Sequence, residues 1–128
     1  MNLADKHVLI LEDEPIIAFA LEDMLIDQGA TVVIASSLGE ATETLSHENY
    51  DFAILDVNLH GEKSYPLAYQ LKDRGIPFVF ATGYGDAEHP EDFAQVPTLT
   101  KPYSLVQIVQ SAEVSGIDAS EERSPPTG

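Results

Sequence analysis

Short, uninterrupted apolar runs alternate along this chain with longer stretches in which apolar residues recur every three or four positions. The run at 7–11 is aliphatic with no alternation of polar residues, which is typical of a strand buried on both faces. By the same reasoning we predict strands over residues 31–35, 51–55, 77–81 and 96–100. Five strands that alternate with helices predict a doubly wound α/β domain with a parallel sheet.

Helical spacing marks the stretches between these strands. Pro15 stands where a helix can begin, and Gly29 is a typical helix stop. The apolar positions of this first helix are Ile16, Ile17, Phe19, Ala20, Met24 and Leu25. We predict a second helix, capped by the serines at 36–37, that runs to about His47. A polar loop over 58–64 then precedes a third helix whose inward-facing residues are Leu67, Ala68 and Leu71.

The last third of the chain has weaker patterns. Glycines and a proline interrupt residues 83–95, which predicts only a short or mobile helix there. Ser104 is expected to cap a final helix. After Gly116 the composition turns to Ser, Glu, Pro and Gly, so we predict one domain over residues 1–116 and a disordered tail over 117–128.

The chain is strongly acidic, with 22 Asp and Glu against 6 Lys and Arg and a formal net charge of −16. This balance disfavours nucleic acid and anionic membrane surfaces as partners, because phosphate contacts need clustered basic residues. The absence of cysteine excludes disulfides and thiolate metal sites. No apolar run resembles a signal peptide or is long enough to span a bilayer, so we expect a cytoplasmic protein.

Reactive polar residues follow four of the predicted strands. The pair Glu12 and Asp13 follows the first strand, and Asp56 follows the third. Thr82 and Lys101 follow the fourth and fifth. Open α/β sheets place their ligand crevice at the carboxyl ends of the strands, so these side chains are expected to share one edge. An acidic pair, a lone Asp, a Thr and a Lys together indicate phosphorylation of an aspartate.

Four segments, in this order, resemble the motifs of the receiver domains of two-component response regulators, over about residues 6–115. They are Ile10-Leu11-Glu12-Asp13-Glu14-Pro15, Ile54-Leu55-Asp56-Val57-Asn58-Leu59, Ala81-Thr82-Gly83 and Thr100-Lys101-Pro102-Tyr103. Each motif is weak alone, but the four together at the right strand ends are specific. The resemblance implies a flavodoxin-like fold with a five-stranded parallel sheet in the order 2-1-3-4-5 and helices on both faces.

A narrower resemblance lies in Phe80-Ala81-Thr82-Gly83-Tyr84-Gly85, which is similar to the signature of the receiver subgroup named FATGUY for its Phe-Ala-Thr-Gly-bulky-Tyr run. Residues 56–62 and 64–68 also resemble that subgroup. Its members are often stand-alone receivers that work with atypical sensor histidine kinases. The resemblance therefore implies a single-domain response regulator.

The resemblance also implies a metal site and a phosphoacceptor. Asp56 would take a phosphoryl group from the phosphohistidine of a sensor histidine kinase or a histidine phosphotransfer protein. Mg²⁺ would neutralise charge in this transfer. Its ligands would be Asp13 and Asp56, with Glu12 acting directly or through water, and the backbone carbonyl of Asn58.

The same resemblance implies that three further residues contact the phosphoryl group. Lys101 would pair with a phosphoryl oxygen, and Thr82 would donate a hydrogen bond to the phosphoryl group. The small Gly83 would let its backbone N–H approach. Many receivers couple these contacts to an aromatic side chain three residues before the Lys, but here that residue is Thr98. Tyr84 and Tyr103 are therefore candidates for the switching role.

Two other functions compete with this interpretation. A phosphatase of the haloacid-dehalogenase kind needs a second acid two residues after its nucleophile, and Asn58 at that position argues against an enzyme with outside substrates. The other is a pseudo-receiver, a binding module that is never phosphorylated. Intact residues at Asp13, Asp56, Thr82 and Lys101 argue against it. We expect a receiver that catalyses only its own phosphorylation and dephosphorylation and signals through protein contacts.

Overall fold

A five-stranded parallel sheet forms the centre of the computed structural model, which describes residues 3–59, 61–82 and 90–100. Its strands lie in the order β2-β1-β3-β6-β7, which confirms the predicted fold and order. The strands are β1 His7–Leu11, β2 Thr31–Ala35, β3 Phe52–Asp56, β6 Phe78–Thr82 and β7 Thr98–Thr100.

The third and fourth of these strands end one residue later than predicted. The predicted ranges stop at Leu55 and Ala81, whereas Asp56 and Thr82 are themselves the last residues of β3 and β6. The sheet ladder continues past the apolar run, because the N–H of Val57 donates to the carbonyl of Ala81 over 2.9 Å. The two polar side chains are therefore held by the sheet and not by a loop.

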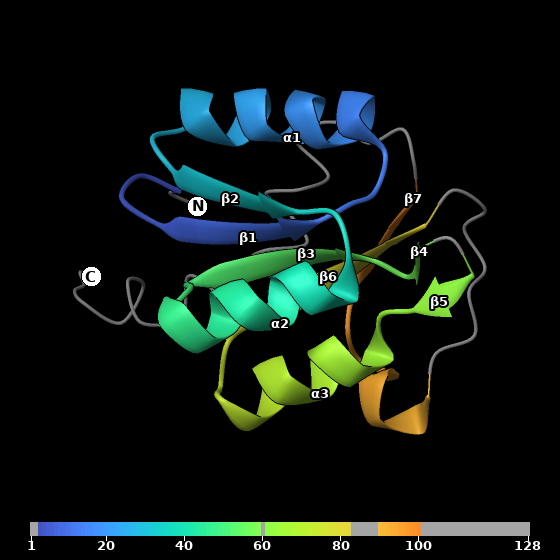
Figure 1. Cartoon of the computed structure of the whole chain (residues 1–128). Helices are drawn as coiled ribbons and strands as arrows, with labels where there is room; N and C mark the ends of the chain where they lie inside the picture. Colours follow the sequence, from blue (N-terminus) through green and yellow to red (C-terminus); the bar gives the residue numbers. More distant parts are fainter. Residues whose placement is uncertain (1–2, 60, 83–89, 101–128) are drawn as a thin grey trace.

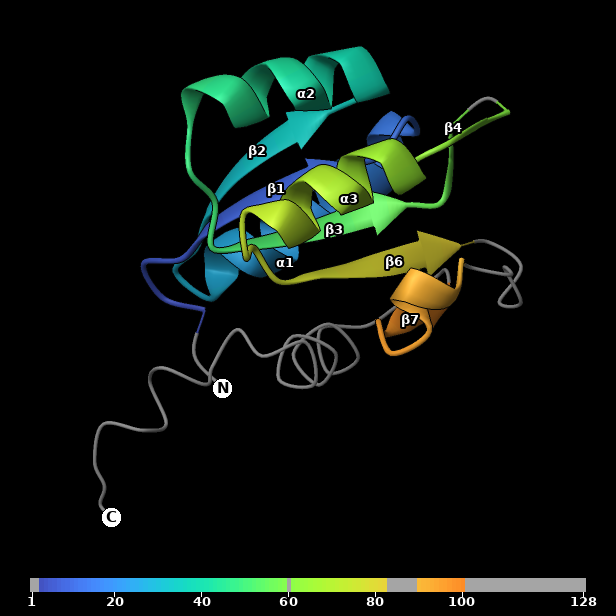
Figure 2. The same cartoon turned by 90° about the horizontal axis from the view of Figure 1, so that it is seen from below.

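Helix α1 (Pro15–Asp27) covers one face of the sheet, and α2 (Leu38–His47) and α3 (Tyr65–Asp73) cover the other, as Figures 1 and 2 show. Pro15 occupies the first helical position of α1, where a missing N–H costs no helix hydrogen bond. The Ser37 hydroxyl caps α2 by accepting the Glu40 N–H over 3.1 Å. All three helices match the predicted stretches, and among the described residues no helix combines the length and apolar character needed to cross a membrane.

Two apolar clusters fill the space between the sheet and its helices. Val8 and Ile10 of β1 face α1, while the alternate residues Leu9 and Leu11 face α2 and α3. This alternation follows from the two-residue repeat of a strand, and helices on both faces bury both sets. The uninterrupted aliphatic runs therefore reflect burial on both sides, as the sequence predicted.

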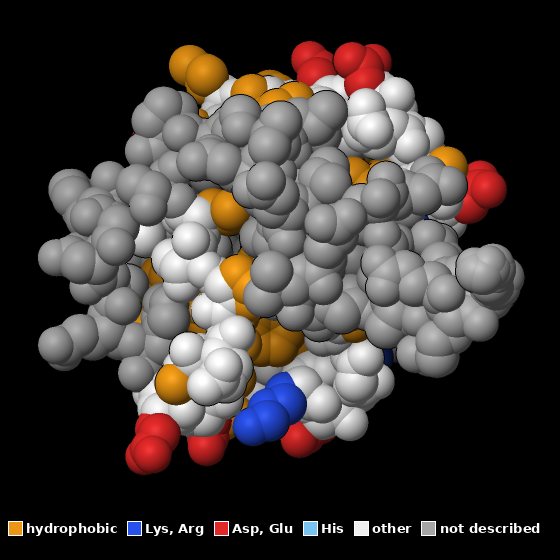
Figure 3. Space-filling model, turned by 180° about the vertical axis from the view of Figure 1, so that it is seen from behind, with side chains coloured by type: hydrophobic (Ala, Val, Ile, Leu, Met, Phe, Trp, Pro, Cys, Tyr) orange, Lys and Arg blue, Asp and Glu red, His pale blue; other side chains and the backbone are white. Residues whose placement is uncertain are grey.

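The inward face of α1 differs from the apolar set that helical spacing suggested. Ala18, Leu21 and Leu25 are buried against the sheet. Ile16 and Phe19 are 83% and 58% exposed. Figure 3 shows hydrophobic side chains at the upper edge of the molecule, where α1 lies, beside acidic ones. The helix is correctly predicted, but part of its apolar surface faces solvent.

The predicted polar loop over 58–64 contains a small antiparallel hairpin instead. Its strands are β4 Asn58–Leu59 and β5 Glu62–Lys63. Gly61 has a φ of 87°, and its N–H donates to the Asn58 side-chain oxygen over 3.0 Å. Two-residue strands give no periodicity to detect, so the sequence pattern predicted a loop.

A turn of 3₁₀ helix, η1 Glu91–Phe93, precedes β7. It falls within the stretch where a short helix was predicted. Phe93 is fully buried and packs against rings from α3 and β6: Tyr65, Tyr69, Phe78 and Phe80. The helix expected after Ser104, the tail at 117–128 and the residues Tyr84 and Tyr103 lie outside the described residues.

Candidate functional site

Asp56 lies at the carboxyl end of β3, the central strand of the sheet. Strand β1 pairs with one side of β3 and β6 with the other, and Asp56 is in register with Ala81. The side chain is only 6% exposed. A carboxylate in this position is rigidly supported and largely shielded from bulk water, which suits a nucleophile.

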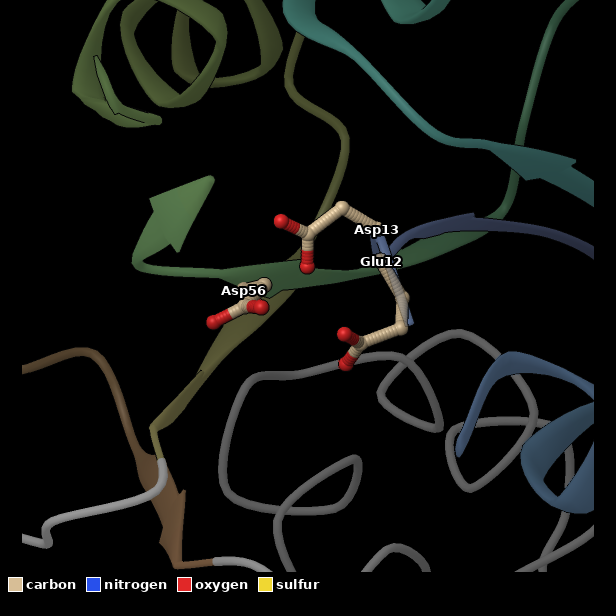
Figure 4. Close-up of side chains that lie close together, drawn as sticks. All are labelled: Glu12, Asp13 and Asp56. Carbon is tan, nitrogen blue, oxygen red and sulfur yellow. The ribbon is translucent and has the colours of Figure 1, made fainter. Parts of the chain in front are cut away.

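Two further carboxylates reach Asp56 from the chain just after β1. Each of Glu12, Asp13 and Asp56 brings a carboxylate oxygen within 4.8 Å of the others. Figure 4 shows these three side chains close together. The Glu12 N–H donates to the Ala35 carbonyl over 3.0 Å, which ties this turn to the end of β2. Glu12 is 2% exposed. The structure thus brings together three of the predicted metal ligands.

Three ionised carboxylates this close repel one another unless positive charge offsets the repulsion. At 4.8 Å and an effective dielectric constant near 20, one pair of unit negative charges repels by about 3.5 kcal/mol. A bound cation would offset this repulsion. The donors are all carboxylate oxygens, which are the ligands that Mg²⁺ and Ca²⁺ prefer and thiolate-seeking metals do not. The donor set therefore fits Mg²⁺ with its remaining positions open to water and substrate oxygens.

The hairpin after Asp56 directs the backbone of Asn58 away from its partner strand. The Ser64 N–H donates to the Val57 carbonyl over 3.0 Å, which makes Val57 and Ser64 a hydrogen-bonded pair. Hydrogen-bonded and non-hydrogen-bonded pairs alternate along an antiparallel ladder, so the next pair, Asn58 and Lys63, is of the second kind. The Asn58 carbonyl consequently points outward from the hairpin, away from Lys63.

Thr82 ends the neighbouring strand β6 at the same edge of the sheet. It is mostly buried and in register with Thr100 of β7. The strand pairing therefore places Thr82 at the end of the strand next to β3. The two remaining predicted residues, Gly83 and Lys101, lie outside the described residues.

Two features of this region had not been predicted. Glu12 uses a carboxylate oxygen to accept the N–H of Glu14 over 3.1 Å, at the start of α1. The hydroxyl of Ser64 is completely buried and has no hydrogen-bond partner within the part of the chain that the structure describes. The hydrogen bond from Glu14 to Glu12 could have been suspected only weakly, from a carboxylate that stands two residues before the N-cap residue. No pattern in the sequence indicates the second.

The position of the acidic cluster defines the class of this protein. In doubly wound sheets of the order 2-1-3-4-5, ligands bind outside the carboxyl ends of the strands where the strand order reverses, between β1 and β3. Glu12 and Asp13 follow β1 and Asp56 ends β3, so the cluster lies at that switch point. The molecule is a flavodoxin-like α/β domain with an acidic, oxygen-only site at its ligand edge.

The family follows from comparison with known sequences. The family described as the response regulator receiver domain matches residues 8–113, and the chain belongs to it. Its relatives include the TorCAD operon transcriptional regulatory protein TorR of Escherichia coli K12, 30% identical over 81 residues, and the aerobic respiration control protein ArcA, 31% identical over 78. These alignments cover 62% and 60% of this chain but only 35% and 33% of those proteins, so the chain matches about a third of their length.

Solved structures agree with this assignment. The solution structure of SdrG from Sphingomonas melonis Fr1 is 38% identical with a TM-score of 0.77, over 90% of this chain and 98% of SdrG. The stress response regulator PhyR is 26% identical with a TM-score of 0.70, over 88% of this chain and 45% of PhyR. A CheY-like receiver domain from Methylobacillus flagellatus, 21% identical with a TM-score of 0.75, matches in fold over 88% of this chain and 99% of its own.

Proposed function

We propose that this protein is a single-domain response regulator that accepts a phosphoryl group on Asp56 in a Mg²⁺-dependent reaction. The observation that carries the proposal is the convergence of Glu12, Asp13 and Asp56 at the switch point of the sheet. The match of residues 8–113 to the receiver family supports a receiver domain over 1–116. The similarity to SdrG, which covers 90% of this chain and 98% of the SdrG chain, supports the single-domain part of the proposal.

The proposed reaction transfers a phosphoryl group from a histidine nitrogen of the donor to a carboxylate oxygen of Asp56. A carboxylate oxygen of Asp56 forms a bond to phosphorus as the bond from phosphorus to the donor's histidine nitrogen breaks, and the imidazole leaves as a neutral base after taking up a proton. Bound Mg²⁺ would supply charge neutralisation for the two anionic groups. Burial of Asp56 limits the access of water, which favours phosphoryl transfer over hydrolysis.

The remaining residues hold the reacting groups. Asp13 and Asp56, together with Glu12 and the Asn58 carbonyl, are the proposed ligands of the magnesium ion. The outward direction of the Asn58 carbonyl supports this assignment. Thr82 would donate a hydrogen bond to the phosphoryl group.

Lys101 and Gly83 complete the proposed phosphoryl site. The Lys101 ammonium would pair with one phosphoryl oxygen, and the Gly83 N–H would donate to another. The register of Thr82 with Thr100 supports the role of Lys101, because this lysine follows Thr100 directly in the chain. We also place the protein in the FATGUY receiver subgroup, on the strength of its residues 80–85.

The proposed partners are a sensor histidine kinase or a histidine phosphotransfer protein. Such a partner has to approach the edge where the acidic cluster lies. Ile16 and Phe19 lie within the first two turns of α1, which starts directly after the cluster, and both are exposed. Exposed apolar side chains on the helix that begins just after the acidic pair support a protein partner over a small phosphoryl donor as the physiological source.

Intact mass after incubation with acetyl phosphate tests this proposal. The wild type should gain one phosphoryl group only when Mg²⁺ is present, and Asp56→Asn should gain none. Asp51→Asn is a matched control, because Asp51 directly precedes the opposite end of β3 and should leave the adduct unchanged.

An adduct that persists in Asp56→Asn would assign the phosphoacceptor elsewhere. A wild type that gains no phosphoryl group from acetyl phosphate or from a panel of phosphorylated kinases would contradict the proposed function. In that case the pseudo-receiver that binds partners without phosphorylation becomes the better hypothesis.

A further inference from the structure

The start of α1 is held by a side chain that belongs to the acidic cluster. Glu14 is the N-cap residue of the helix, and its own side chain makes no capping hydrogen bond. Pro15 follows at the first helical position and has no N–H. The Glu14 N–H donates to a carboxylate oxygen of Glu12 over 3.1 Å. Glu12 thus fixes the backbone at the point where the chain leaves the cluster and enters the helix.

The same Glu12 carboxylate faces Asp13 and Asp56. It is almost fully buried, and one of its oxygens lies within 4.8 Å of oxygens from both aspartates. A carboxylate has two oxygens and can serve two partners. One side chain therefore connects the candidate metal site with the first turn of the helix.

We infer that Glu12 is a positioning residue that couples cation binding at the acidic cluster to the placement of the first turn of α1. This inference rests on the proposed Mg²⁺-dependent function and extends it to the regulation of a neighbouring surface. A cation at the cluster would attract the Glu12 carboxylate together with those of Asp13 and Asp56. The Glu12 side chain would then be held in one place, and its hydrogen bond to Glu14 would persist for more of the time.

The turn that Glu12 holds carries exposed apolar residues. Ile16 is the second residue of α1 and Phe19 is one turn further along. A change in how firmly Glu14 is held changes the freedom of this surface with respect to the sheet. Cation occupancy would in this way prepare the apolar surface of the first two turns of α1 before any phosphoryl group arrives.

Amide hydrogen exchange measured by NMR on the full chain tests the first half of the inference without any metal. We expect Glu12→Ala to speed exchange at the Glu14 amide by roughly two- to tenfold, the range expected for one hydrogen bond of ordinary strength. Glu12→Gln keeps an amide oxygen that can accept the same N–H, so its Glu14 rate should stay near that of the wild type. Glu22→Gln removes one charge from α1 away from the cluster and serves as the matched control.

The exchange rate at the buried Leu9 amide in the same spectra reports whether each variant is folded. Equal rates at Glu14 in the wild type and Glu12→Ala would overturn the inference. Equally fast exchange in Glu12→Gln and Glu12→Ala would also overturn it, because a charge effect would then explain the result without the hydrogen bond.

Addition of Mg²⁺ tests the coupling itself. In the wild type, saturating Mg²⁺ should slow exchange at Glu14 further, and in Glu12→Ala it should not. Apparent Mg²⁺ affinity, read from the Asp13 and Asp56 resonances, should fall by about tenfold in Glu12→Gln. Shifts at Asp13 and Asp56 with an unchanged Glu14 rate in the wild type would overturn the coupling alone. A wild type whose aspartate resonances do not respond to Mg²⁺ would contradict the proposed metal-dependent function, and the metal-free comparison would still decide whether Glu12 holds Glu14.

Discussion

Truncation of Phe93 to Ala should destabilise the domain severely, although this residue lies in the stretch with the weakest sequence pattern. Its ring is 0% exposed, with ring centroids 4.6 Å from Tyr69, 5.6 Å from Phe80 and 5.8 Å from Phe78. Loss of a fully buried Phe side chain costs about 3–5 kcal/mol. Domains of this kind have total stabilities of only about 5–15 kcal/mol, so the loss is a large share.

Urea unfolding followed by circular dichroism measures the effect. With a dependence of about 2 kcal/mol per molar urea, the midpoint of Phe93→Ala should fall by roughly 1.5–2.5 M. Phe19→Ala is the matched control, because the same atoms are removed from a side chain that is 58% exposed. It should cost about 1 kcal/mol or less. If the two variants had similar midpoints, the assignment of η1 to the core would be wrong.

Three further predictions concern the surroundings of the site and the outer loops. Ser64→Ala should raise the free energy of unfolding, measured by urea titration, by about 1 kcal/mol, because it removes a buried hydroxyl that has no hydrogen-bond partner among the described residues. A loss of stability would show that the hydroxyl has a partner. Gly29→Ala should lower the free energy of unfolding by about 1–2 kcal/mol and with it the melting temperature. The reason is that Gly29 has a φ of 90° and that an added Cβ would lie 3.1 Å from the Cα of Ala4. An unchanged melting temperature would contradict this strain. Burial raises the pKa of Tyr50, so its contribution to stability is complete below the unfolded pKa near 10 and is lost as pH rises through the higher folded pKa. Melting temperatures from about pH 9 to 11 should therefore fall less steeply in Tyr50→Phe, and equal slopes would refute the assignment.

The strands of the sheet could be predicted because their apolar composition indicates that they are buried. Runs such as those in β1 and β3 are apolar without alternation, and a strand covered on both faces favours that pattern. The ends of the strands were less predictable. Apolar character stops before Asp56 and Thr82, but the backbone ladder does not, because main-chain hydrogen bonds are independent of side-chain polarity.

The acidic cluster was predictable for a related reason. Residues that follow parallel strands meet at one edge, so strand order alone brings Glu12 and Asp13 to Asp56. Contacts that depend on a particular rotamer or turn could not be predicted in this way. The hydrogen bond from Glu14 to Glu12 and the direction of the Asn58 carbonyl both depend on local backbone geometry that the residue types do not specify.

Helix α1 shows why apolar periodicity alone does not identify a core. Ile16 and Phe19 are three positions apart, and so are Ala18 and Leu21; a helical repeat accepts either pair as its inner face. Only the rotation of the helix about its axis separates them, and in the structure that rotation buries Ala18, Leu21 and Leu25. The pair left outside lies on the helix that begins just after Glu12 and Asp13, and under the proposed function the acidic site has to be reached by a protein carrying phosphohistidine. The apolar excess of α1 is then accounted for by two surfaces, one that packs on the sheet and one available for contact with that protein.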